Sequence, residues 1–214
     1  MVRDKGAIFD MDGTILDSMW VWSQIDIEFL GKRGFTVPPD YLEMITPMGY
    51  QRAAEYTIER FGLNEKPEDL IEEWYRMAAD AYAEKVLLKP HAKEYLQALR
   101  DSGTRIAAAT SSAYELVAPC LRRNGVLEYF EEFVTTMEVP RGKEFPDVYL
   151  EAANRLGINP QDCIAYEDIY KGICAARMAG CRTVAMKEAA SEYEADKIRA
   201  AADYYISDFM ELME

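Results

Sequence analysis

Residues 9–18 read FDMDGTILDS and follow a short apolar run that begins at Ala7. A continuously apolar run predicts a strand buried on both faces, as in a parallel sheet. Two carboxylates, Asp10 and Asp12, stand two positions apart at the end of this run, and Gly13 follows them at once. Carboxylates held together raise each other's pKa, so the pair indicates a cation that neutralises it.

Short apolar runs alternate with helical patterns over most of the remaining chain, which predicts a parallel sheet covered by helices and hence an α/β fold. Gly180 is expected to end one helix, Pro146 suits the first turn of another, and Ser112 opens an N-terminal capping box with Glu115. The predicted strands are residues 7–10, 105–110, 132–136, 163–167, 182–186 and 204–206.

One region, from about Ile15 to Leu88, breaks this alternation. It contains amphipathic helical patterns rich in tryptophan and tyrosine and no convincing strand. We interpret residues 15–88 as a helical insertion, with residues 1–14 and 89–214 forming the core. Both linkers would then lie at one edge of the sheet.

The composition limits the possible partners. With 214 residues, half of them apolar, the chain can bury a sizeable core. A net charge of −14 disfavours nucleic acid and anionic membranes, and a phosphate ester would need a local cation. Since the chain has no apolar run of about 18 residues, and Asp10 and Asp12 come early, we expect neither a membrane span nor a secretion signal, and we predict a cytoplasmic protein.

The cysteines and the single histidine give no sign of a metal cluster. Cys120, Cys163, Cys174 and Cys181 form no CxxC pair and are expected to be reduced thiols. His91 is expected to be structural, although a contact with substrate or a role in hinge motion stays open.

In an open α/β sheet, ligands bind beyond the carboxyl ends of the strands, and Asp10 stands at the end of the first one. A divalent ion such as Mg²⁺ suits hard carboxylate ligands. Gly13 gives this loop the freedom to bend around a ligand, and Thr14 adds a hydroxyl.

The DMDGT motif, residues 10–14, resembles the opening motif of the haloacid dehalogenase superfamily of phosphatases and phosphomutases. Candidates for the other three motifs follow in the expected order. They are Thr110 at the end of IAAAT, Lys143 in GKEFPD, and the pair Glu167 and Asp168 in YEDIYKG. The resemblance implies a Rossmann-like core with an inserted helical cap.

The resemblance also assigns roles. Asp10 would attack phosphorus and form an aspartyl-phosphate, while Asp12 would act as general acid and then as general base. Thr110 and backbone N–H groups at the start of the next helix would bind the phosphoryl oxygens, and Lys143 would supply positive charge.

Mg²⁺ would be held by Asp10, the backbone carbonyl of Asp12, and Asp168. Glu167 would be either a direct ligand or a residue that acts through water. The expected substrate-binding residues are Gly13, Thr14, Ser111, Trp22 and Arg52.

Three positions depart from the family pattern. Glu144 replaces a proline that often follows the lysine, and Ile169 replaces a serine after the acidic pair. Trp22 stands where the β-phosphoglucomutase branch has a histidine in the cap-entry segment.

The sequence therefore favours a Mg²⁺-dependent phosphatase of a small phosphorylated metabolite, a sugar or polyol phosphate, acting as a monomer or weak dimer. A sugar phosphomutase is the alternative. A catalytically idle binding protein is more distant, and a dehalogenase is less favoured still.

Overall fold

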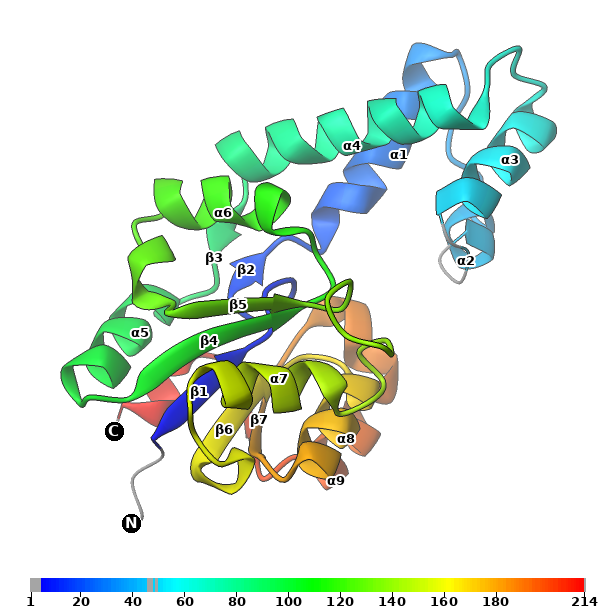
Figure 1. Ribbon diagram of the computed structural model, residues 1–214. Helices are drawn as coiled ribbons and strands as arrows, with labels where there is room; N and C mark the ends of the chain where they lie inside the picture. The colour runs from blue at the N-terminus through cyan, green and yellow to red at the C-terminus, as the bar shows by residue number, and fades with distance from the viewer. Residues whose placement is uncertain (1–4, 46–47, 49, 214) are drawn as a thin grey trace. The chain divides into compact units, whose positions relative to one another are not determined.

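A computed structural model describes residues 5–45, 48 and 50–213, and it shows a six-stranded parallel sheet (Figure 1). The α/β fold and all six expected strands are confirmed, with shifts of one residue at three strand ends. The first strand begins and ends one residue earlier than expected, which places Asp10 in the loop beyond it. The strands of the sheet, in spatial order, are β5 (Glu132–Thr135), β4 (Arg105–Thr110), β1 (Gly6–Phe9), β6 (Cys163–Glu167), β7 (Arg182–Met186) and β8 (Tyr204–Ile206).

Side chains of β1 alternate between two buried layers. Ile8 belongs to the apolar layer that the buried residues of α7 and α8 share. Phe9 lies on the other face, where its ring stacks on Tyr166 at 4.0 Å and meets Tyr95 of α5 edge-on at 6.5 Å. Because both faces are covered, every residue of β1 is buried. The helices around the sheet are α5 (Ala92–Asp101), α6 (Tyr114–Arg123), α7 (Asp147–Arg155), α8 (Tyr170–Ala179) and α9 (Ala195–Ala201).

The strand order explains why polar groups gather at one edge of the sheet. The chain runs outward from β1 through β4 to β5, and then returns to the other side of β1 to build β6, β7 and β8. In such sheets ligands bind where the strand order reverses, beyond the carboxyl ends of the strands. The strands β1, β4 and β6 meet there, and Asp10, Thr110 and Glu167 stand at or just past their ends.

Two of the predicted helix signals have different outcomes. Gly180 ends α8 in a left-handed conformation, with φ of 99°, as expected. The prediction of a capping box at Ser112 is wrong, because α6 begins after Ala113 and lacks a side-chain cap. The hydroxyl of Ser112 donates instead to the carboxylate of Asp12, at 2.5 Å.

The chain divides into two compact units, Met1–Ser18 with Val86–Glu214, and Met19–Lys85. The second unit is helical. Residues 15–88 were expected to contain no strand, and this expectation is wrong at the two ends of that range. There β2 (Leu16–Asp17) pairs antiparallel with β3 (Leu87–Leu88), and both strands belong to the first unit. No helix of the described residues has the length and hydropathy to cross a membrane. The helices of the second unit are α1 (Trp20–Lys32), α2 (Tyr41–Ile45), α3 (Tyr50–Phe61) and α4 (Pro67–Glu84).

Candidate active site

Three carboxylates form the centre of the candidate site. Asp10 follows β1, and Glu167 and Asp168 come at the end of the neighbouring strand β6. Their side chains each offer an oxygen within 4.8 Å of the others. All three residues are buried, with exposed fractions of 5%, 0% and 2%. Three acidic groups that lie this close together and are shielded from water need positive charge nearby to stay ionised.

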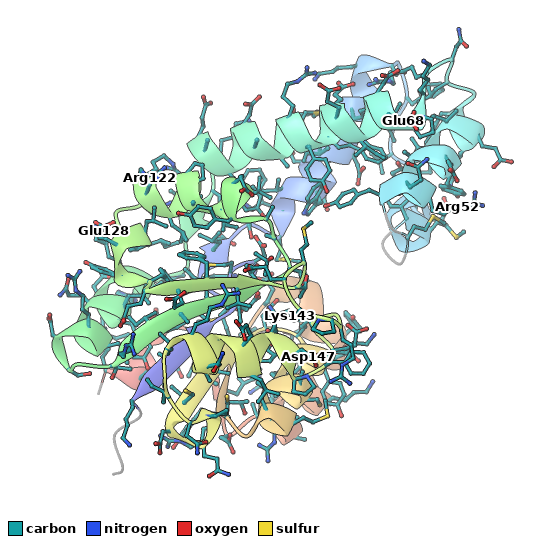
Figure 2. All side chains as sticks on the ribbon, in the orientation of Figure 1. Arg52, Glu68, Arg122, Glu128, Lys143 and Asp147 are labelled. Carbon is teal, nitrogen blue, oxygen red and sulfur yellow. The ribbon has the colours of Figure 1, made fainter. Side chains whose placement is uncertain are left out.

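Lys143 supplies part of that charge. It lies in the loop that leads into α7 (Figure 2), and its Nζ contacts Asp10 Oδ1 and lies 2.8 Å from Glu167 Oε1. Burial lowers the pKa of Lys143, but the two carboxylates outweigh burial and raise the pKa above its ordinary value. Lys143 is therefore a permanent cation at neutral pH.

The pKa values of the acidic residues show that one lysine does not balance the cluster. Burial raises the pKa of Asp10 well above its usual range, and the charges of Glu167 and Asp168 raise it further, against the lowering effect of Lys143. Burial and the charge of Glu167 also raise the pKa of Asp168 to about 7. The remaining negative charge fits a second cation.

The donor set fits a hard divalent cation such as Mg²⁺. Carboxylate oxygens are the hard ligands that this ion prefers. Glu167 Oε2 is buried and has no hydrogen-bond partner in the part of the chain that the structure describes. An unpaired carboxylate oxygen in a dry site is costly, and a bound cation would remove that cost. Asp10, Glu167 and Asp168 could therefore hold the metal.

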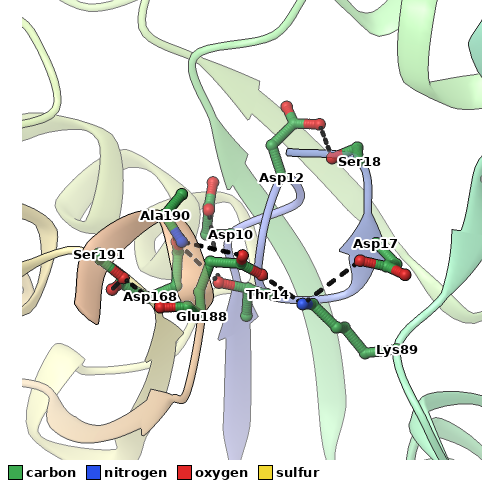
Figure 3. A network of polar contacts seen from close by, with 10 residues as sticks. All are labelled: Asp10, Asp12, Thr14, Asp17, Ser18, Lys89, Asp168, Glu188, Ala190 and Ser191. Carbon is green, nitrogen blue, oxygen red and sulfur yellow. Dashed lines mark hydrogen bonds and ion pairs between the residues drawn. The ribbon is translucent and has the colours of Figure 1, made fainter. Parts of the chain in front are cut away.

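The loop after β1 packs tightly beneath this cluster. Gly13 has φ of +81°, and a Cβ there would lie 2.4 Å from Asp168 Oδ2. Glycine is required by both the backbone and the close approach. Thr14 Oγ1 lies 3.4 Å from Asp10 Oδ2 and 3.3 Å from Asp168 Oδ1 (Figure 3). Because Thr14 is fully buried against these carboxylates, its position favours a supporting role over the expected substrate contact.

Asp12 stands apart from the acidic cluster. Ser18 donates to its Oδ1 at 2.7 Å, and Ser112 donates to its Oδ2 at 2.5 Å. Neither contact was expected from the sequence, although Ser18 ends the quoted stretch 9–18. Since hydroxyl groups donate to both of its oxygens, the Asp12 side chain is held in one orientation outside the three-carboxylate cluster. Metal binding by its backbone carbonyl stays a prediction.

Thr110 ends β4 and is buried, and its Oγ1 accepts a hydrogen bond from the backbone N–H of Ser112 at 3.0 Å. Ser111, between them, is exposed. The turn that links β4 to α6 thus lies at the same edge of the sheet as Asp10.

The sequence model of the haloacid dehalogenase-like hydrolase family matches residues 7–186 of this chain, which include all four motifs. The chain belongs to this family. It is therefore an enzyme of the family's hydrolase class, as the resemblance implied.

Individual relatives agree with this assignment. The chain is 32% identical over 218 residues to the protein CbbY of Rhodobacter capsulatus, covering 95% of this chain and 93% of that protein. It is 30% identical over 187 residues to hexitol phosphatase A of Escherichia coli K12, covering 86% and 84%.

Solved structures share the fold. A variant of CbbY from Rhodobacter sphaeroides in complex with xylulose-1,5-bisphosphate matches with a TM-score of 0.78 and 23% identity, over 97% of this chain and 96% of that one. β-Phosphoglucomutase from Clostridium difficile matches with a TM-score of 0.73 and 19% identity, over 97% and 92%.

Two expected substrate-binding residues of this haloacid dehalogenase-like chain belong to the helical unit. Trp22 packs on Tyr50, with ring centroids 5.8 Å apart. The Arg52 side chain is 64% exposed and pairs with Glu55 at 3.4 Å. Their part in substrate binding stays a prediction.

The backbone conformation of His91 is unusual for a residue other than glycine. His91 adopts a left-handed conformation with φ of 56°, in which glycine is favoured. Its Nδ1 lies 2.7 Å from Asp208 Oδ1. This contact supports the structural role expected for His91.

Proposed function

We propose that the protein is a Mg²⁺-dependent phosphatase of a small phosphorylated metabolite, a sugar or polyol phosphate, and that it works through an aspartyl-phosphate on Asp10. The observation that carries the proposal is the buried cluster of Asp10, Glu167 and Asp168 with Lys143 against two of its members. The names of the relatives, a hexitol phosphatase among them, support the substrate class.

In the first half-reaction, a carboxylate oxygen of Asp10 forms a bond to phosphorus while the bond from phosphorus to the ester oxygen breaks. Asp12 gives its proton to the departing oxygen, so the product leaves as an alcohol. The charge of Lys143 favours the ionised form of the attacking carboxylate, because it lowers the pKa of Asp10 against the raising effect of burial. Thr110 and nearby backbone N–H groups orient the phosphoryl oxygens.

In the second half-reaction, water attacks phosphorus and the bond to Asp10 breaks. Asp12 accepts the proton of the water, which restores both carboxyl groups to their starting states. Mg²⁺, when bound, supplies positive charge to the carboxylates and to the phosphoryl group. Ser18 and Ser112 keep Asp12 in place for both proton transfers.

A sugar phosphomutase is the second candidate, and the shared fold with a β-phosphoglucomutase favours it. Such an enzyme must return the phosphoryl group to sugar before water reaches it. The tryptophan at position 22, in place of the histidine of that branch, argues for hydrolysis.

The test is a phosphate-release screen over hexitol, hexose and pentulose phosphates, with Mg²⁺ and then with a chelator. We expect free phosphate from at least one substrate with the wild type, and a loss of about 10³-fold or more in Asp10→Asn, which removes the nucleophile. Equal rates in the two proteins would end the proposal. Isomerised sugar phosphate without free phosphate, dependent on a bisphosphate primer, would favour the mutase.

We further propose that the protein acts in the cytoplasm as a monomer or weak dimer.

A further inference from the structure

Tyr149 of α7 contacts a member of the acidic cluster, although the sequence pattern marks it only as a core residue. Its ring is fully buried in the apolar layer between α7 and the sheet. Its hydroxyl donates a hydrogen bond to Glu167 Oε1. The ring of Tyr149 thus packs in the apolar core, while its hydroxyl hydrogen-bonds to a carboxylate of the candidate site.

The two oxygens of Glu167 have different surroundings. Oε1 accepts from the Tyr149 hydroxyl and lies 2.8 Å from Lys143 Nζ. Oε2 is buried and has no hydrogen-bond partner among the described residues. The carboxyl group also packs against Gly172 of α8, where a Cβ would lie 2.5 Å from both its carbon and Oε2. Contacts on these sides restrict its rotation.

We propose that Tyr149 is a positioning residue that fixes the carboxylate of Glu167, so that Oε1 is occupied and Oε2 is the oxygen available to a divalent cation held with Asp10 and Asp168. The inference rests on the magnesium site of the proposed function. It assigns Glu167 as a direct ligand, a point that the sequence left open.

Lys143 does not fix this orientation alone. Its ammonium group is a compact charge on a flexible chain, and Glu167 shares it with Asp10. The phenol of Tyr149 has one donor on a ring that the core holds in place. Partners of this kind orient metal ligands, and their loss weakens metal binding by about 10- to 100-fold.

The test compares Mg²⁺ binding to the wild type and to Tyr149→Phe by calorimetry. Phenylalanine keeps the ring and removes only the hydroxyl. The matched control is Tyr95→Phe, which removes a buried hydroxyl that pairs with Tyr166 at 2.5 Å in the same unit. We expect Tyr149→Phe to weaken Mg²⁺ binding by about 10-fold or more, and the control to leave it unchanged.

Thermal unfolding without metal separates positioning from folding. We expect the two variants to lose similar stability without Mg²⁺, and Mg²⁺ to raise the unfolding temperature less in Tyr149→Phe than in Tyr95→Phe. In a Glu167→Gln background, Tyr149→Phe should have no further effect on Mg²⁺ affinity, because its target is already changed.

The possible failures are distinct. A wild type that binds no Mg²⁺ would overturn the magnesium site and this inference with it. A wild type that binds Mg²⁺, together with a Tyr149→Phe variant of equal affinity, would overturn the role of Tyr149 alone.

Discussion

Gly172→Ala should impair catalysis, because the added methyl group would displace the buried carboxylate of Glu167. Gly172 lies in α8 at an ordinary helical φ, so alanine fits the backbone there. Replacing a helical glycine with alanine stabilises a protein by about 0.5 to 1 kcal/mol when the new methyl group finds room. At this position the methyl group finds the Glu167 carboxylate.

The size of the effect on catalysis follows from one distance. The Cβ would lie 2.5 Å from the carboxyl carbon, whereas ordinary contacts begin at 3.4 Å, so the carboxyl group must retreat by about 0.9 Å. That movement disturbs the contacts of Glu167 Oε1 with Tyr149 and Lys143. Misplacing a catalytic group by about 1 Å can cost about 100-fold in rate, and we expect a loss of this order.

Gly31→Ala is the matched control. Gly31 lies near the end of α1, and a Cβ there would meet no atom within 4 Å. We expect this variant to gain stability and to keep its turnover and Mg²⁺ affinity.

The assays are phosphate release, Mg²⁺ calorimetry and thermal unfolding on all three proteins. A folded Gly172→Ala protein with wild-type turnover and wild-type Mg²⁺ affinity would refute the reasoning. Equal losses of activity in both alanine variants would also refute it, since only one of them crowds the site.

Three further predictions concern charge. Lys89 is largely buried beside Glu188 (Figure 3), so Lys89→Met should leave that buried carboxylate without its opposite charge and cost about 3 kcal/mol in urea unfolding. An unchanged midpoint would show that the pair contributes nothing. The raised pKa of Asp168, about 7, means that the stability from its bound proton is present at low pH and is lost as pH rises through 7. Mg²⁺ competes with the same proton, so calorimetry should show its affinity rising from pH 5.5 to 8, and a flat profile would contradict this. Burial raises the pKa of Asp26 in the helical unit to about 7, so Asp26→Asn should stabilise that unit by about 2 to 4 kcal/mol at pH 8 and by less at pH 5, measured by urea unfolding at both pH values; an equal gain at the two would argue against an ionised Asp26.

The strands were predictable because burial on both faces leaves a continuous apolar run, as in residues 163–166. The pair β2 and β3 was not predictable, since strands of two residues have no period to detect. The failure at Ser112 has a different cause. Its local signal is that of a helix cap, in which the serine oxygen accepts a hydrogen bond from a backbone N–H. In the structure the Ser112 hydroxyl instead donates to a carboxylate 100 positions away in the sequence.

The grouping of the acidic residues could also be anticipated, because the ends of neighbouring parallel strands meet at one edge. The supporting contacts could not. Tyr149 follows the apolar pattern of α7, and nothing in that pattern tells which group its hydroxyl meets. The same holds for Gly172, whose closeness to Glu167 depends on how α8 packs against β6.

The most direct test of the account is to look for the phosphorylated enzyme itself. The protein is mixed with p-nitrophenyl phosphate and Mg²⁺, quenched in acid within milliseconds, and digested for mass spectrometry. We expect one added phosphoryl group, on the peptide that contains Asp10, and its absence in Asp10→Asn. Phosphate release at full rate with no phosphoryl group on Asp10 would contradict it.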